Sequence, residues 1–163
     1  MRLMKTSLFA YGFRSNFFLA GVAAVLLVPV WAVSFAAGTP LGTAWPPTLW
    51  HAHEMLFGFI AIAIAGFMLT AVPSWTGQKG FAGAPLVALA AVWLTARLLI
   101  ASSGLWPAWV PAIADLAFLP FLALLVMIPL LHSKNRNSPL LIVLGLFWIT
   151  NLERACPIRA HYA

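Results

Sequence analysis

The chain alternates between long apolar stretches and short, more polar connectors. Each of the first four stretches has roughly the 20 apolar residues that a helix needs to cross the hydrocarbon core of a bilayer. A fifth, shorter apolar run follows them. The predicted spans are 17–37, 49–72, 83–102 and 107–131, with a partial span over 140–152. All should be helical, because a backbone that faces lipid must satisfy its own hydrogen bonds.

This pattern predicts an all-α fold, a polytopic bundle of transmembrane helices that occupies residues 1–152 as one domain. The composition agrees, since 63% of the residues are hydrophobic, only 7% are charged and the mean hydropathy is +0.98. A soluble domain carries about 25% charged residues. The first stretch is longer than the roughly 7–15 apolar residues of a secretory signal peptide, so we expect it to be retained. The lipid bilayer is the first partner that the sequence predicts.

Basic residues lie before span one, between spans two and three, and between spans four and five: Arg2, Lys5, Arg14, Lys79, Lys134 and Arg136. Cytoplasmic connectors carry an excess of Lys and Arg, which predicts a cytoplasmic N-terminus. The formal charge of +6 is thus assigned to orientation signals, and no nucleic-acid partner is predicted. The connectors 38–48 and 103–106 carry no charge. A predicted interfacial aromatic belt lies near that outer side: Trp31, Trp45, Trp50, Trp106 and Trp109.

The end of the chain breaks this pattern. Residues 153–163 are polar, and if the run 140–152 crossed the membrane, Arg154 and Arg159 would lie on the outer side, against the charge rule. This favours a truncated or frameshifted end to a longer membrane protein. The alternative is a segment that is half inserted at the membrane interface.

Ionisable residues within the predicted spans are few: His51, His53, Glu54, Arg97 and Asp115. Such groups are costly inside a membrane and usually mark a site that binds or moves something. The first three stand in the opening turns of the second span. The predicted topology places Arg97 and Asp115 in the same outer half of the membrane. The sequence therefore predicts one outward-facing polar site built by three helices.

Helical geometry separates the two histidines, because positions two apart differ by about 200° around a helix. His51 shares a side with Glu54 and with small residues that let another helix approach. His53 shares its side with Phe57 and Ile60, a bulky apolar surface suited to lipid or to the face of a haem. If residues 48–52 are unwound, the two imidazoles could instead converge on one metal.

Each candidate also has a plainer interpretation. His51 alone could be an interfacial residue with its polar tip in water. Arg97 could snorkel to the interface instead of pairing with Glu54, Asp115 or an anionic cofactor group. Asp115 could be a buried, protonated packing residue. His132, in a basic connector, is predicted to be a solvated connector residue.

Histidine is the usual ligand of haem iron and of copper. The chain has one cysteine, Cys156, and no Cys-x-x-Cys-His motif. This excludes a cysteine-based metal cluster and covalent attachment of a c-type haem. The residues alone indicate an outward-facing His/Glu site and do not name its metal.

The run Trp-His-Ala-His-Glu-Met-Leu-Phe-Gly-Phe over residues 50–59 resembles the signature of the NnrS family. So does its continuation over 65–77, Ala-Gly-Phe-Met-Leu-Thr-Ala-Val-Pro-Ser-Trp-Thr-Gly. Gly-Phe-Arg at 12–14 and Gly-Ala-Pro-Leu at 83–86 support the resemblance, which covers residues 8–152 and ends before Glu153. Members of this family are longer bacterial inner-membrane proteins that contain haem and copper. They are linked to nitric oxide metabolism and to tolerance of nitrosative stress.

The resemblance implies a multi-pass, haem- and copper-binding protein of the bacterial inner membrane, with a role in nitric oxide response or nitrosative-stress protection. The implied metal ligands are His51 and His53, supported by Glu54, Arg97 and Asp115. His53 would bind haem, and His51 with Glu54 would serve a second metal, but the resemblance leaves open which histidine binds which metal. No catalytic residue is implied and enzymatic turnover is not assigned. The C-terminal helices of a longer family member would be a further partner.

Two other functions stay open. His51, His53, Glu54 and Asp115 could form a proton or cation path in a transporter or channel. The chain could also be a purely structural or assembly subunit of a membrane complex.

Overall fold

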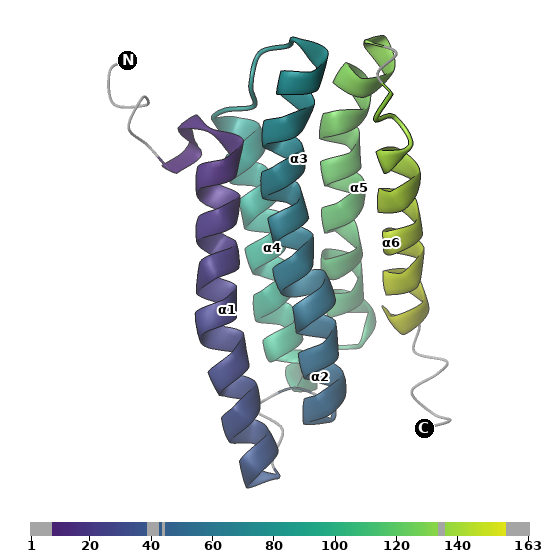
Figure 1. Ribbon diagram of the computed structural model, residues 1–163. Helices are drawn as coiled ribbons and strands as arrows, with labels where there is room; N and C mark the ends of the chain where they lie inside the picture. The colour runs from purple at the N-terminus through teal and green to yellow at the C-terminus, as the bar shows by residue number, and fades with distance from the viewer. Residues whose placement is uncertain (1–7, 39–42, 44, 134–135, 156–163) are drawn as a thin grey trace.

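The computed structural model describes residues 8–38, 43, 45–133 and 136–155, which form a bundle of helices (Figure 1). The helices are α1 (Gly12–Ala37), α2 (Pro47–His53), α3 (Ala61–Thr76), α4 (Ala84–Ala101), α5 (Trp109–His132) and α6 (Leu140–Ala155). A π-helical segment, Glu54–Ile60, joins α2 to α3 and is called the π segment below. Short 3-10 turns, Leu8–Ala10 and Ser103–Leu105, precede α1 and follow α4. No strand occurs among the described residues.

Within the described part of the chain, four helices are long and apolar enough to cross a membrane: Gly12–Ala37, Pro47–Thr76, Ala84–Ala101 and Trp109–His132. The second of these consists of α2, the π segment and α3 in one continuous rod. The apolar helix α6 is shorter. The predicted all-α transmembrane bundle is therefore confirmed, and the protein is a multi-pass membrane protein whose apolar helices contact the lipid bilayer.

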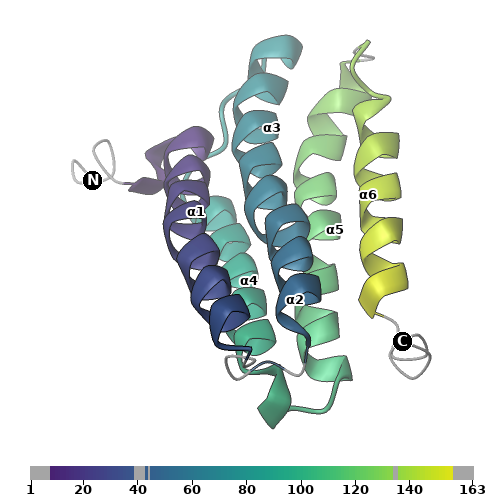
Figure 2. The same ribbon diagram turned by 60° about the horizontal axis from the view of Figure 1, so that its bottom comes forward.

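The helices lie side by side, with α1 and α6 at opposite edges of the bundle (Figure 2). α3 packs against both α1 and α5, and α5 also packs against α4 and α6. Consecutive spans run in opposite directions, so the last turns of α1, α4 and α6 lie at the end of the bundle where α2 and α5 begin (Figure 1). We call this end the site end, because the candidate functional residues gather there.

Small residues allow α1 and α3 to approach closely. A Cβ added at Gly12 would lie 2.7 Å from the Cβ of Leu69, which is closer than two such atoms can stand. On the second span, Ala61 and Ala65 have no exposed surface. Close backbone approach of this kind is a common way for helices to associate in lipid. The side of small residues that the sequence predicted is thus buried inside the bundle.

The second span extends beyond both ends of the predicted range 49–72. It begins at Pro47, where a proline is favoured because the N–H groups of a first helical turn lack partners in any case. It continues through Pro73 to Thr76, since other groups in a membrane protein can compensate for the hydrogen bond that proline removes. The helix ends instead at Gly77, which adopts the left-handed φ of 66° that suits glycine.

Some predictions fall outside the described residues, namely those on Arg2, Lys5, Lys134 and the tail from Cys156 onward. Helix α6 continues past the predicted limit of the apolar run and reaches Ala155. His132 is the last residue of α5 and is exposed, in agreement with its interpretation as a solvated connector residue.

The tryptophans predicted as an interfacial belt divide into two groups. Trp106 and Trp109 are exposed at the site end, as an interfacial position requires. Trp50 is buried, so the belt prediction is wrong for this residue. The rings of Trp31 and Trp45 pack on the two candidate histidines, so their contacts are with the protein.

Candidate functional site

A buried cluster of polar side chains lies near the site end of the bundle. It consists of His53 at the end of α2, Glu54 in the π segment, Arg97 in α4, Asp115 in α5 and Asn151 in α6. We call these five residues the polar cluster. Each is only 1% to 8% exposed. The structure brings four of the five ionisable candidates, which come from three different spans, into contact with one another.

Arg97 lies between the two carboxylates of the polar cluster. Its Nη1 donates a hydrogen bond to Glu54 Oε2 at 2.9 Å, and its Nη2 donates one to Asp115 Oδ1. A guanidinium suits this position because it stays charged and presents several donors in a planar fork. A buried charge is costly unless it is paired and hydrogen-bonded. Arg97 therefore does not snorkel to the interface, and its predicted pairing with Glu54 and Asp115 is confirmed.

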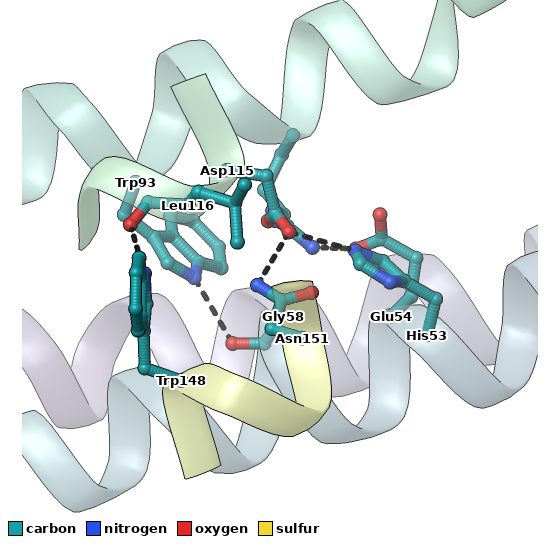
Figure 3. Close-up of polar contacts among 9 residues, drawn as sticks. His53, Glu54, Gly58, Trp93, Asp115, Leu116, Trp148 and Asn151 are labelled. Atoms are coloured by element: carbon teal, nitrogen blue, oxygen red, sulfur yellow. Dashed lines mark hydrogen bonds and ion pairs between the residues drawn. The ribbon is translucent and has the colours of Figure 1, made fainter. Parts of the chain in front are cut away.

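The second oxygen of Asp115 faces α2 and α6 (Figure 3). Asn151 Nδ2 donates a hydrogen bond to Asp115 Oδ2 at 2.8 Å. His53 Nε2 lies 3.2 Å from the same oxygen. Through one carboxylate, α5 is thus connected to side chains of α2, α4 and α6.

Two further contacts hold α6 against the site. Trp148 Nε1 donates a hydrogen bond to the Leu116 carbonyl of α5 at 2.9 Å. The Phe147 ring stacks on Phe57 of the π segment, with 4.9 Å between the ring centroids. The apolar run that the sequence predicted as a partial span is therefore a structural part of the candidate site.

Gly58 in the π segment makes room for the pair of Arg97 and Glu54. A Cβ added there would lie 2.6 Å from Glu54 Oε2 and 3.1 Å from Arg97 Nη1. The Gly58 carbonyl also accepts a hydrogen bond from Trp93 Nε1 at 3.0 Å, which connects the π segment to α4. π-helical turns are rare and frequently occur at functional sites.

The two histidines of the motif have different surroundings. The His51 ring is partly exposed and stacks on Trp31 of α1, with centroids 4.1 Å apart and 20° between the ring planes. The His53 ring is buried, with the Trp45 ring edge-on at 4.8 Å and Phe57 at 5.1 Å. The predicted separation of the two imidazoles is therefore confirmed, as is the contact of His53 with Phe57.

Other parts of the helical-phase prediction are wrong. Glu54 groups with His53 in the polar cluster and not with His51. His53 faces the interior of the bundle and not lipid. Arg97 bridges Glu54 to Asp115. Because Asp115 lies against His53, these ion pairs group Glu54 with His53. Residues 48–52 are helical, so the alternative in which an unwound segment brings both imidazoles to one metal is wrong as well.

Among the described residues, no group of three or more His, Cys, Asp or Glu side chains is arranged to hold a metal ion. Each histidine nevertheless fits the role of a single ligand. The Nδ1 atoms of His51 and His53 are buried and make no hydrogen bond within the described structure. A neutral imidazole can present such a nitrogen as an electron-pair donor. A ligating histidine usually turns its other ring nitrogen to a carboxylate or carbonyl, and Asp115 stands at this position for His53.

The sequence pattern did not single out Asn151 or Trp93. Asn151 is an amide within an apolar run, and a polar side chain at membrane depth needs a partner, so this signal could have identified it. Trp93 carried no comparable signal, because tryptophan is common in membrane helices for reasons unrelated to a site.

The family described as NnrS protein matches residues 7–158 of the chain. The matched range includes the polar cluster and His51. No curated protein matches the chain, and no solved structure does.

Proposed function

The chain belongs to the NnrS family, and we propose that it binds haem and copper in the bacterial inner membrane and serves nitric oxide response or nitrosative-stress protection. The observation that carries the proposal is the pair of separated imidazoles, each with a buried ring nitrogen that makes no hydrogen bond among the described residues. Two separate histidine ligands suit two separate centres. Haem iron and copper are metals that imidazole binds well, which supports the proposal together with family membership.

The space around each imidazole suggests which group it takes. His51 is partly exposed, and the flat ring of Trp31 lies on it. A group as large as haem can approach only an imidazole with open surface, so we assign haem to His51. His53 is 2% exposed, which excludes a group as large as haem, so we assign the smaller copper ion to His53. The sequence favoured the reverse assignment because it placed His53 on a lipid-facing side.

The other members of the polar cluster would hold the ligands in place. Asp115 contacts His53, and Arg97 balances the charges of Asp115 and Glu54. Outer contacts of this kind orient a ligating histidine and tune its basicity. One imidazole does not fill the coordination of a metal, so each centre would take further ligands from groups outside the polar cluster. Haem and copper would supply the chemistry of nitric oxide binding, while the chain positions them.

We also propose that the N-terminus is cytoplasmic and that the site end faces the outer side. Arg14 and Lys79 lie at the bundle end opposite the polar cluster, as the charge rule predicts for the cytoplasmic face. In a Cys156→Ser background, a membrane-impermeant thiol reagent added outside spheroplasts should label Leu105→Cys and not Gln78→Cys. The opposite labelling pattern would reverse the orientation.

The main test is the haem spectrum and the copper content of the chain purified in mild detergent. We expect both groups in the wild type and neither in a variant with His51→Ala and His53→Ala together. His132→Ala is the matched control, because it removes an exposed imidazole at the other end of the bundle, and it should retain both groups. A wild-type protein that holds neither haem nor copper after expression with both supplied would contradict the proposal.

A proton or cation path is a second candidate, favoured by four buried ionisable side chains in one cluster. It predicts flux across the membrane of liposomes that contain the protein without haem or copper. Arg97 works against this function, because it pairs with both carboxylates and places a fixed positive charge between them. Liposomes with the wild-type chain that show no flux above empty liposomes would exclude it.

A further inference from the structure

We propose that Asn151 of α6 positions Asp115 so that His53 carries its proton on Nε2 and presents Nδ1 as its ligating nitrogen. The inference rests on the proposed function, in which His53 binds a metal ion. It goes beyond that function by naming Nδ1 as the atom through which His53 binds the metal and Asn151 as the residue that selects this atom.

Both oxygens of Asp115 act as acceptors. Oδ1 accepts a hydrogen bond from Arg97, while Oδ2 accepts one from Asn151 and lies 3.2 Å from His53 Nε2. An ionised carboxylate has no hydrogen to donate, so the ring nitrogen that faces it is favoured to carry the proton. A neutral imidazole has a single N–H. With that hydrogen on Nε2, the electron pair of Nδ1 is available to a metal.

The surroundings of Nδ1 agree with this role. Both ring nitrogens of His53 are buried, and neither makes a hydrogen bond within the described residues. In that part of the chain only Nε2 has an ion-pair contact, with Asp115 Oδ2 at 3.2 Å, so Nδ1 is the nitrogen left for another partner. The neighbouring rings are those of Trp45 and Phe57. A buried acceptor without a partner destabilises the folded state by about 1–3 kcal/mol. A metal ion bound at Nδ1 would remove this cost, which gives the otherwise unexplained nitrogen a purpose.

Asn151 fixes the direction of the Asp115 carboxylate. Arg97 holds one oxygen, and the hydrogen bond from Asn151 holds the other against His53. The amide oxygen of Asn151 makes no hydrogen bond among the described residues, so the side chain acts here as a donor to Asp115. Trp148 anchors the preceding turn of α6 to the Leu116 carbonyl, which keeps the amide in place. Asn151 is therefore a positioning residue that acts on His53 through Asp115.

Nitrogen NMR of the histidine rings tests the proposal in the metal-free protein at alkaline pH. The chemical shift of a ring nitrogen shows whether it carries a hydrogen, and a His53→Gln variant assigns the His53 signals. We expect the wild type to carry the hydrogen on Nε2. Asn151→Leu should give a mixture of both tautomers. Thr150→Val is the matched control on the same helix, because the Thr150 hydroxyl donates to the Phe147 carbonyl of α6 itself, and it should match the wild type.

A hydrogen on Nδ1 of wild-type His53 would overturn the proposal, whatever the variants show. An Asn151→Leu protein with the wild-type tautomer would overturn it as well. If Asn151→Leu does not fold, Asn151→Ser replaces it, since the shorter side chain cannot reach Asp115 at the present distance and should also give a mixture.

A copper titration adds a second measurement. Loss of a group that orients a ligating histidine typically weakens metal binding about 10–100-fold, so we expect a loss of this size in Asn151→Leu and none in Thr150→Val. Equal copper affinity of Asn151→Leu and wild type would count against the role of Asn151. A wild type that binds no copper would contradict the proposed function, while the tautomer measured without metal would still decide the arrangement of His53, Asp115 and Asn151.

Discussion

The second span has two halves that make different contacts with the bundle. Its first half, from His53 through the π segment, meets the Arg97 guanidinium of α4 and the Asp115 carboxylate of α5. The same carboxylate accepts a hydrogen bond from the Asn151 amide of α6. Its second half, Ala61–Thr76, is regular α-helix and packs on α1 through small and apolar side chains. The polar half is irregular where the apolar half is regular.

This difference shows how a membrane helix can combine a site with a stable framework. Apolar helices gain little from the hydrophobic effect in lipid, so their association depends on close packing and on polar contacts between helices. The apolar half uses close packing. The polar half is π-helical instead of α-helical, and Gly58 in this segment leaves the space in which Arg97 reaches Glu54. Charges are thus confined to the half in which a binding role is proposed.

Removal of Arg97 should have the largest effect on the polar half. Arg97→Leu leaves Glu54 and Asp115 buried without their common partner, which should lower the free energy of unfolding by about 3–5 kcal/mol. Unfolding of the purified protein in mixed detergents measures this change. Lys79→Leu is the control, because Lys79 is an exposed cation at the opposite end, and it should stay within about 0.5 kcal/mol. An equal loss of unfolding free energy in both variants would show that the buried ion pairs of Arg97 do not stabilise the polar half.

The close contact of the apolar half can be tested at Gly12. Gly12→Ala places a Cβ against the Cβ of Leu69, and overpacking of this kind costs about 1–3 kcal/mol. The metal content should not change, since the contact lies away from the site end. Gly21→Ala in the same helix meets no atom within 4 Å and should leave the unfolding free energy unchanged or slightly higher. If Gly21→Ala were as destabilising as Gly12→Ala, close approach of α1 and α3 would not be the cause.

Compared with Gly12→Ala, substitution of Gly58 should have a smaller effect on the unfolding free energy and a larger effect on the copper content. In Gly58→Ala the new methyl group meets the ends of two side chains that can shift, so we expect a loss of about 1–2 kcal/mol. The copper content should fall, because the Arg97 pair that supports Asp115 is displaced. Gly145→Ala in α6 meets no atom within 4 Å and should keep both the copper and the stability of the wild type. Full copper content in Gly58→Ala would show that copper binding does not depend on the space that Gly58 leaves for Arg97 and Glu54.

The smallest predicted change concerns the anchor of α6. Trp148→Phe keeps an aromatic ring but removes the hydrogen bond to the Leu116 carbonyl, which should cost about 0.5–1.5 kcal/mol. Trp109→Phe, at an exposed ring, should have a smaller effect in the same unfolding assay. A Trp148→Phe protein as stable as Trp109→Phe would mean that α6 is held by its other contacts.

The depth of the charged residues could be predicted from the sequence. Each long apolar stretch crosses the bilayer once, so its length determines which residues of neighbouring spans share a level. Glu54, Arg97 and Asp115 could be grouped on this basis, and the structure pairs them. A prediction of depth needs only the lengths and the order of the spans.

The direction of each side chain around its helix could not be predicted in the same way. Regular helical phase placed Glu54 on the side of His51, whereas the ion pairs within the polar cluster group it with His53. Asn151 was recognisable as a polar residue in an apolar run, but that run was too short to be placed as a full span, so the pattern did not identify Asp115 as its partner. Both errors concern contacts between helices. Such contacts depend on how each helix is rotated about its own axis, which hydropathy does not reveal.

The separation of the two histidines is the central claim, and the haem spectrum together with the copper content of the single variants tests it most directly. His51→Ala should lose haem and keep copper, because its imidazole stacks on Trp31 away from the polar cluster. His53→Ala should lose copper and keep haem, since its imidazole lies against Asp115. Loss of both groups from each single variant, with the helical fold intact by circular dichroism, would contradict two separate centres. Retention of both groups in each variant would contradict histidine ligation altogether.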